Sequence, residues 1–143
     1  MKTFIVLALL VASIGPAAAA PAARPFVVIV NAANAVTLTR GDVVDIFLKR
    51  ITRWQPDNVP IVVVDEPAES PVREAFSRAL MRRGVEAVEA YWQQQIFSGR
   101  DVPPVVKETD ADVVAFVRSN PGAIGYVARG AALEGVRVVV LDK

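Results

Sequence analysis

Runs of β-branched and other apolar residues alternate along the chain with segments whose apolar positions recur at helical spacing. Phe26–Asn31, Ile61–Val64 and Ala123–Val127 are almost continuous apolar runs, which is typical of strands covered on both faces. Val136–Leu141 and the shorter Val105–Lys107 have the same character. The pattern therefore predicts five strands, separated by segments that are long enough for helices.

Three of the predicted helices begin with a recognisable N-cap. Thr39 is followed three residues later by Asp42, which predicts a capping box. Ser70 precedes Pro71, the arrangement favoured at a helix start because proline needs no hydrogen-bond acceptor at the first helical position. Thr109 precedes a third amphipathic segment. We expect a helix to start at each of these residues.

The ends of the helices are marked by residues that tolerate unusual backbone angles. We expect the helix that starts at Ser70 to end at Gly84, and a fourth helix to cover Glu86–Phe97. Asn120 precedes a Pro-Gly pair and is predicted to end the last helix in the left-handed conformation. Gly125 interrupts a buried strand, which indicates that another group approaches the backbone closely there.

Strands that alternate with helices predict one three-layer α/β domain, a mostly parallel sheet flanked by helices. The first 20 residues are predicted to be outside this domain. Lys2, the apolar run Phe4–Ile14 and the small residues Ala17–Ala20 have the three-part pattern of a secretory signal peptide, with cleavage after Ala19 or Ala20. We therefore expect residues 21–143 to form a single domain in the periplasm, with no stable membrane insertion after cleavage.

The composition of the chain excludes several classes of functional site and partner. The chain has no cysteine and no histidine, which excludes thiol nucleophiles, Cys/His zinc sites and Ser-His-Asp triads. We expect no enzyme activity, no cofactor and no metal. The formal net charge is +1, and loss of Lys2 with the signal brings it close to zero. Because nucleic-acid binders normally have a marked basic excess, we expect no nucleic-acid partner.

Four segments, taken together and in order, form a recognisable set. They are Val27–Val36, Leu38–Leu48 with the later Trp54, Ile61–Val64 with the later Ser70 and Phe76, and Asn-Pro-Gly-Ala-Ile-Gly-Tyr-Val at Asn120–Val127. With these segments the chain resembles the solute-binding proteins of phosphate ABC transporters. The resemblance implies one lobe of a type II periplasmic binding protein. It also implies binding of a small anion such as phosphate, which could be handed to a membrane transporter or another periplasmic protein.

The expected anion-binding motif is altered in this sequence. In the family that it resembles, the helix begins with Ser-Gly-Thr and is preceded by an arginine and an aspartate. Ser70 matches the serine, but Pro71 and Val72 stand for the glycine and the threonine. Glu66 and Ala68 stand where the arginine and the aspartate would be. The altered motif predicts at best weak phosphate binding, because a carboxylate replaces a cation.

The candidate ligand-binding residues are Ser70, Val72, Arg73 and Asn34. Each has a purely structural alternative. Ser70 would be a plain N-cap, Arg73 would belong to a solvated helix face, and Asn34 would cap a loop. Two functions remain open at this stage. One is a secreted module that binds a small anion, and the other is a single-lobe scaffold without ligand that serves protein–protein interaction or signalling.

Overall fold

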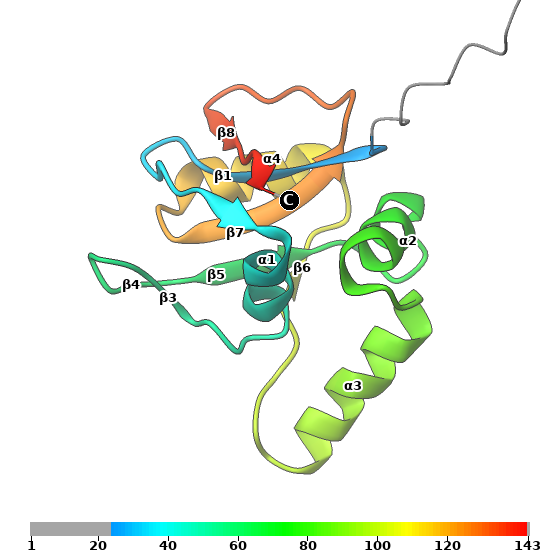
Figure 1. Cartoon of the computed structure of the whole chain (residues 1–143). Helices are drawn as coiled ribbons and strands as arrows, with labels where there is room; N and C mark the ends of the chain where they lie inside the picture. The colour runs from blue at the N-terminus through cyan, green and yellow to red at the C-terminus, as the bar shows by residue number, and fades with distance from the viewer. Residues whose placement is uncertain (1–23, 143) are drawn as a thin grey trace, which may run out of the picture.

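The computed structural model describes residues 24–142, so the predicted signal peptide at residues 1–20 lies outside the described part. A five-stranded sheet forms the centre of the domain (Figure 1). Its strands, in spatial order, are β6 (Val105–Val106), β5 (Val62–Asp65), β7 (Ala123–Ala128), β1 (Phe26–Asn31) and β8 (Val136–Val138).

Strand direction divides this sheet into two halves. β5 pairs in parallel with β6 and β7, whereas β1 pairs antiparallel with β7 and β8. The sheet is therefore mixed. The alternation of strands and helices predicts a mostly parallel sheet, but two of its four strand pairings are antiparallel. Because β1 runs against β7, Val30 near the end of β1 lies opposite Ile124 near the start of β7. The loop after β1 and the loop after β5 consequently leave opposite ends of the sheet.

Helices cover both faces of the sheet and give the three expected layers (Figure 1). They are α1 (Arg40–Phe47), α2 (Pro71–Phe76) with the π-helical turn η1 (Ser77–Met81), α3 (Val85–Phe97) and α4 (Asp110–Ser119). Side chains of α4 pack with Ile29 and Val64 on one face, while α1, α2 and η1 pack with Val28 and Val30 on the other. In Figure 1, α3 extends away from the sheet.

The predicted N-caps are confirmed. The Thr39 N–H donates to Asp42 at 2.8 Å, and the Asp42 N–H donates to the Thr39 hydroxyl at 3.2 Å, so the capping box is complete. The Ser70 hydroxyl accepts from the Arg73 N–H at 3.2 Å, and the Thr109 hydroxyl accepts from Asp112 at 3.1 Å. These bonds satisfy backbone donors that the first turn of a helix leaves free.

Two predicted helix ends are wrong. Asn120 has extended backbone angles, φ −124° and ψ 109°, and its side-chain amide closes α4 by donating to the Phe116 carbonyl at 2.7 Å. The helix after Ser70 ends before Gly84, because Arg82 takes the left-handed conformation with φ 56°. Gly84 is instead the N-cap position of α3.

Short strands outside the main sheet account for two further differences. The predicted last strand is divided, because β8 pairs with β1 and the separate β9 (Leu141–Asp142) pairs with β2 (Leu38–Thr39). No strand is predicted between the first helix and Ile61, yet β3 (Arg53–Trp54) and β4 (Val59–Pro60) pair there as a hairpin. Within residues 24–142, none of the helices combines the length and the apolar character needed to cross a bilayer.

Two glycines allow other groups to approach the backbone closely, a side chain at Gly125 and a backbone carbonyl at Gly122. A Cβ at Gly125 would lie 2.9 Å from Val113, which confirms the close approach predicted there. A Cβ at Gly122 would lie 2.2 Å from the carbonyl oxygen of Pro60. The Gly122 carbonyl accepts from the Trp54 indole at 2.9 Å and from the Val62 N–H at 2.9 Å. One carbonyl thus connects the β3–β4 hairpin to the main sheet.

Candidate functional site

The candidate site lies where the chain leaves β5 and enters α2. Ser70 caps α2, and its hydroxyl donates a very short hydrogen bond to one carboxylate oxygen of Glu66. The same hydroxyl oxygen accepts from the Arg73 N–H. The N-cap interpretation of Ser70 is therefore confirmed, and its only hydroxyl proton is directed at Glu66 rather than at open solvent.

Glu66 is a buried carboxylate, with 4% of its surface exposed. Its second oxygen, Oε1, is buried and has no hydrogen-bond partner. The pKa of Glu66 is raised to about 7, first by burial and then by the neighbouring Asp110 carboxyl, whereas the Ser70 hydroxyl opposes the shift. The Glu66 carboxyl therefore keeps its proton to a higher pH than an exposed glutamate does.

Arg73 does not reach the surface, contrary to the expectation of a solvated helix face. It is 5% exposed, and its guanidinium contacts Asp65 at 3.4 Å and Glu89 at 2.5 Å. It also donates to the Glu66 carbonyl at 3.0 Å. Because two carboxylates already neutralise this cation, little of its positive charge remains for a ligand.

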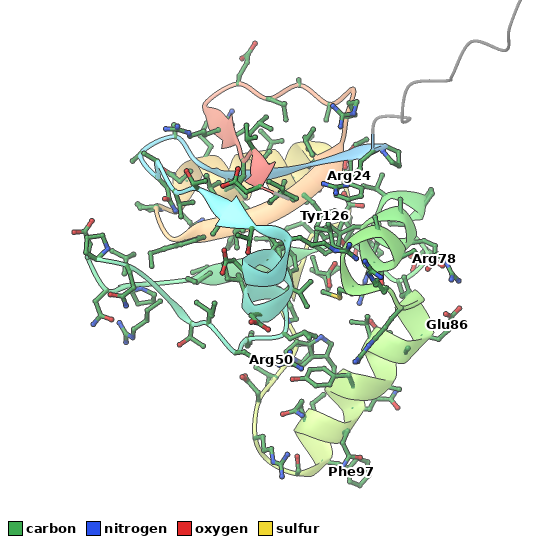
Figure 2. The ribbon with its side chains drawn as sticks, viewed as in Figure 1. Arg24, Arg50, Arg78, Glu86, Phe97 and Tyr126 are labelled. Atoms are coloured by element: carbon green, nitrogen blue, oxygen red, sulfur yellow. The ribbon has the colours of Figure 1, made fainter. Side chains whose placement is uncertain are left out.

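Asp65 and Tyr126 complete the buried polar group behind the site. The Tyr126 hydroxyl donates to Asp65, and Tyr126 lies fully inside the fold (Figure 2). Burial raises the pKa of Asp65 while Arg73 counteracts that shift. Burial, and then the Asp65 charge, raises the pKa of Tyr126, so Tyr126 serves as a neutral donor.

A pocket of about 360 Å³ opens in front of Ser70. It is lined by Glu66, Pro67, Glu69, Ser70, Pro71, Val72, Glu108 and Asp110. The lining contains four carboxylates and no lysine or arginine. Ser70 and Val72 are therefore brought together here, but the charge of the pocket is opposite to that of an anion-binding site.

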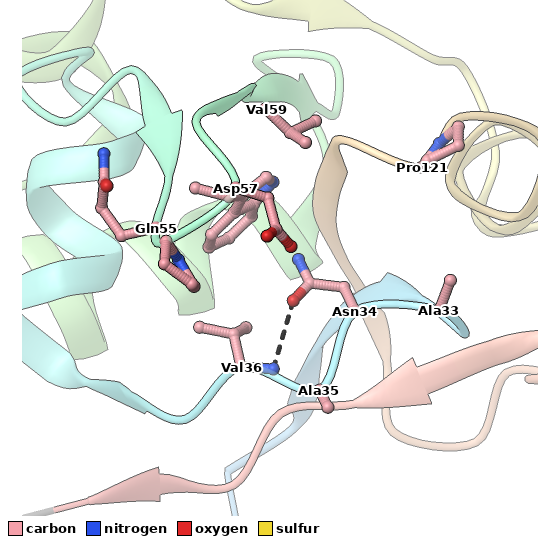
Figure 3. A pocket seen from close by; sticks show the side chains of 10 residues that line it. Ala33, Asn34, Ala35, Val36, Gln55, Asp57, Val59 and Pro121 are labelled. Carbon is pink, nitrogen blue, oxygen red and sulfur yellow. Dashed lines mark hydrogen bonds between the residues drawn. The ribbon is translucent and has the colours of Figure 1, made fainter.

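Asn34 lies at the other end of the sheet, in a separate hollow of about 410 Å³ (Figure 3). Trp54, Asp57 and Pro121 also line this hollow. The Asn34 side-chain oxygen accepts from the Val36 N–H at 3.1 Å, which agrees with a loop cap. The structure therefore does not bring Asn34 together with Ser70. Asn34 follows β1, which runs antiparallel to β7, whereas Ser70 follows β5, which runs parallel to β7. The two residues consequently lie at opposite ends of the sheet.

Sequence reasoning missed that Asp110 and Glu108 line the pocket in front of Ser70. Asp110 lies in the first turn of α4, where a negative charge is favourable in any helix, so its sequence position alone does not indicate a site. The signal that links both residues to Glu66 is topological. β6 pairs in parallel with β5, so the segments that follow the two strands leave the same edge of the sheet.

The comparisons with known proteins agree with this architecture. A family model described as the PBP superfamily domain matches residues 15–140. The chain belongs to this family. No curated protein matches the chain.

Solved structures similar to this PBP superfamily chain include phosphate-transport proteins. An ABC-type phosphate transport receptor from Vibrio cholerae is 23% identical with a TM-score of 0.66, and the match covers 83% of this chain and 46% of the receptor. A protein from Clostridium perfringens with bound phosphate is 24% identical with a TM-score of 0.66, covering 82% of this chain and 45% of that one. PstS from Borrelia burgdorferi is 18% identical with a TM-score of 0.65, covering 83% and 47%.

These likenesses establish the fold and its extent. The chain spans less than half the length of each of these three proteins. It is thus a short relative that matches one lobe of the binding-protein fold, as the sequence predicted, although its sheet is mixed instead of mostly parallel.

Proposed function

We propose that this chain is an exported single-lobe module of the phosphate-receptor type that acts by docking to another protein, not by clamping free phosphate. The partner would be a membrane transporter or another periplasmic protein, and no catalytic step is assigned to the module. The likeness to phosphate-transport receptors supports the lineage, and the pattern of residues 1–20 supports export.

The observation that carries this proposal is the position of Glu66. Its carboxylate accepts the Ser70 hydroxyl proton at the start of α2, where a bound anion would need that donor. Two like charges 4 Å apart repel by about 4 kcal/mol at an effective dielectric constant of about 20. Glu69, Glu108 and Asp110 line the same pocket and add to this repulsion. A free phosphate ion would therefore have to displace one carboxylate in the presence of three others.

Calorimetric titration of phosphate into the mature protein at pH 7.5 tests the proposal. We expect no saturable binding tighter than about 100 μM, because the charge-assisted donors that normally hold an oxyanion are missing. Titration with sulfate is the matched control for a general anion effect. Saturable binding of phosphate in the sub-micromolar range would contradict the proposal.

A second candidate function, weak binding of phosphate itself, is favoured by one observation. The Clostridium perfringens protein with bound phosphate shares this fold, and Ser70 retains the N-cap position at the start of α2. In E66Q the negative charge is removed while an acceptor for the Ser70 hydroxyl remains. A gain of at least tenfold in phosphate affinity in E66Q would support this second candidate, and unchanged weak binding would count against it.

A further inference from the structure

The pocket in front of Ser70 holds carboxylates that lack a cationic partner within residues 24–142. Ion pairs in the described part of the chain use Lys49, Arg50, Arg73 and Arg78. None of these pairs includes a carboxylate of the pocket. Lys107 is next in sequence to the lining residue Glu108, but its ammonium lies 5.0 Å over the Phe116 ring.

Glu66 supplies an observation that is independent of this acidic lining. Only 4% of the surface of Glu66 is exposed, and its buried Oε1 atom accepts no hydrogen bond. A buried acceptor without a partner destabilises the folded protein, and more so when it is charged. A donor that entered the pocket could remove this destabilisation, because Glu66 is one of the lining residues.

We infer that this pocket binds a cationic head group, a guanidinium or a primary ammonium, between the carboxylates of Glu66, Glu69 and Asp110. The inference shares one premise with the proposed function, namely that the pocket does not seat a free anion. It goes further, because it assigns to the pocket a ligand of the opposite charge.

The shape and chemistry of the lining favour an organic cation over a metal ion. No group of three or more acidic, histidine or cysteine side chains in residues 24–142 is arranged to hold a metal ion. A guanidinium carries five N–H donors in one plane and can reach several separated acceptors at once. Pro67, Pro71 and Val72 also line the pocket, and they offer apolar contact to the alkyl stem that carries such a head group.

The head group could come from a free amine or from a basic side chain of a protein partner. Titration with agmatine and with the peptide acetyl-Gly-Arg-Gly-amide, at 20 mM and 150 mM salt, distinguishes these sources. We expect saturable 1:1 binding of at least one probe in the micromolar to millimolar range, at least threefold weaker at the higher salt. Tighter binding of agmatine identifies a free amine, and tighter binding of the peptide identifies a side chain. The absence of saturable binding by both probes would overturn the inference.

Charge-removing variants locate the bound cation. We expect E66Q to weaken binding of the better probe at least tenfold and E69Q at least threefold, since Glu69 is exposed and its substitution leaves the core intact. E86Q is the matched control, because Glu86 is an exposed carboxylate on α3, outside the pocket (Figure 2). It should change affinity less than twofold. Equal affinity of the original protein, E66Q and E69Q would overturn the inference whatever the outcome of the phosphate titration.

Discussion

At the residue scale, Glu66 is the position where the chain departs most clearly from an anion-binding design. The sequence shows a carboxylate in place of an expected arginine, and the structure shows that this carboxylate is turned inward onto the Ser70 hydroxyl. A glutamate at position 66 thus adds a carboxylate to the pocket and also occupies the hydroxyl of Ser70. Its effect should be measurable in stability as well as in binding.

We predict that E66Q makes the protein more stable at pH 8 but not at pH 5. The pKa of Glu66 is about 7 in the folded protein against an ordinary value of 4.5, so the folded state binds more protons than the unfolded state between these values. The stability that Glu66 contributes is therefore present below pH 4.5 and is lost as the pH rises through 7. A neutral glutamine should avoid this loss, a gain on the order of 1–3 kcal/mol at pH 8.

Urea unfolding of both proteins at pH 5, 6, 7 and 8 measures this effect. The original protein should lose stability across the series relative to E66Q. The control is E86Q, which should show the pH profile of the original protein because Glu86 is exposed. Parallel profiles for E66Q and the original protein would show that Glu66 titrates normally.

Residues with local partners were predictable from the sequence, and residues with distant partners were not. The hydroxyls of Thr39, Ser70 and Thr109 bond within three residues, so their spacing was sufficient. Arg73 was expected on a solvated face, yet its carboxylate partners are 8 and 16 positions away, at Asp65 and Glu89. No local spacing rule indicates that pairing, because it depends on how α2 and α3 sit beside β5.

At the scale of elements, the strands and helices follow from the hydrophobic pattern, while their ends depend on tertiary contacts. The buried strands β1, β5 and β7 were predicted within one or two residues. The last predicted strand was not, because its two halves pair with β1 and with β2. The apolar pattern of a segment does not specify its partner.

We predict that G122A destabilises the junction between the β3–β4 hairpin and the main sheet. A Cβ at this position would lie 2.2 Å from the Pro60 carbonyl oxygen, a backbone atom that can move only with β4. The cost should be about 1–3 kcal/mol, as for other overpacked sites. It is measured as the change in free energy of unfolding by urea denaturation.

G130A is the matched control for this experiment. A Cβ at Gly130 would meet no atom within 4 Å, so this substitution should change stability by less than about 1 kcal/mol. If G122A is tolerated as well as G130A, the hairpin is not held against the sheet as closely as the structure indicates.

At the scale of the whole molecule, the fold class was predictable and the detailed sheet was less so. Alternating strands and helices indicated a three-layer domain, and the family match and similar structures bear this out. The antiparallel pairing of β1 with both β7 and β8 was not visible locally, because it is fixed by long-range topology. The same topology separates Asn34 from Ser70, which sequence order alone could not reveal.

We predict that Arg73 is needed to hold three parts of the molecule together. It contacts Asp65 at the end of β5, Glu89 in α3 and the Glu66 carbonyl. R73M removes the charge while keeping much of the side-chain volume, and leaves Asp65 without its cation. Loss of one member of a buried ion pair costs about 3–5 kcal/mol. We therefore expect a loss of this size in urea unfolding.

R78M provides the comparison on the same helical segment. Arg78 pairs with Glu74, but 67% of its side chain is exposed, so its loss should cost less than about 1 kcal/mol. A similar small loss for R73M would indicate that Asp65 is adequately stabilised by Tyr126 alone.

The two tryptophans, Trp54 and Trp92, are both buried, yet they lie in separate parts of the molecule. Trp54 bonds to Gly122 beside the hairpin, whereas Trp92 lies on α3. Each indole is therefore a built-in fluorophore for its own region. Emission from single-tryptophan versions of the chain would distinguish loosening of the hairpin from loosening of the protruding helix, without any attached dye.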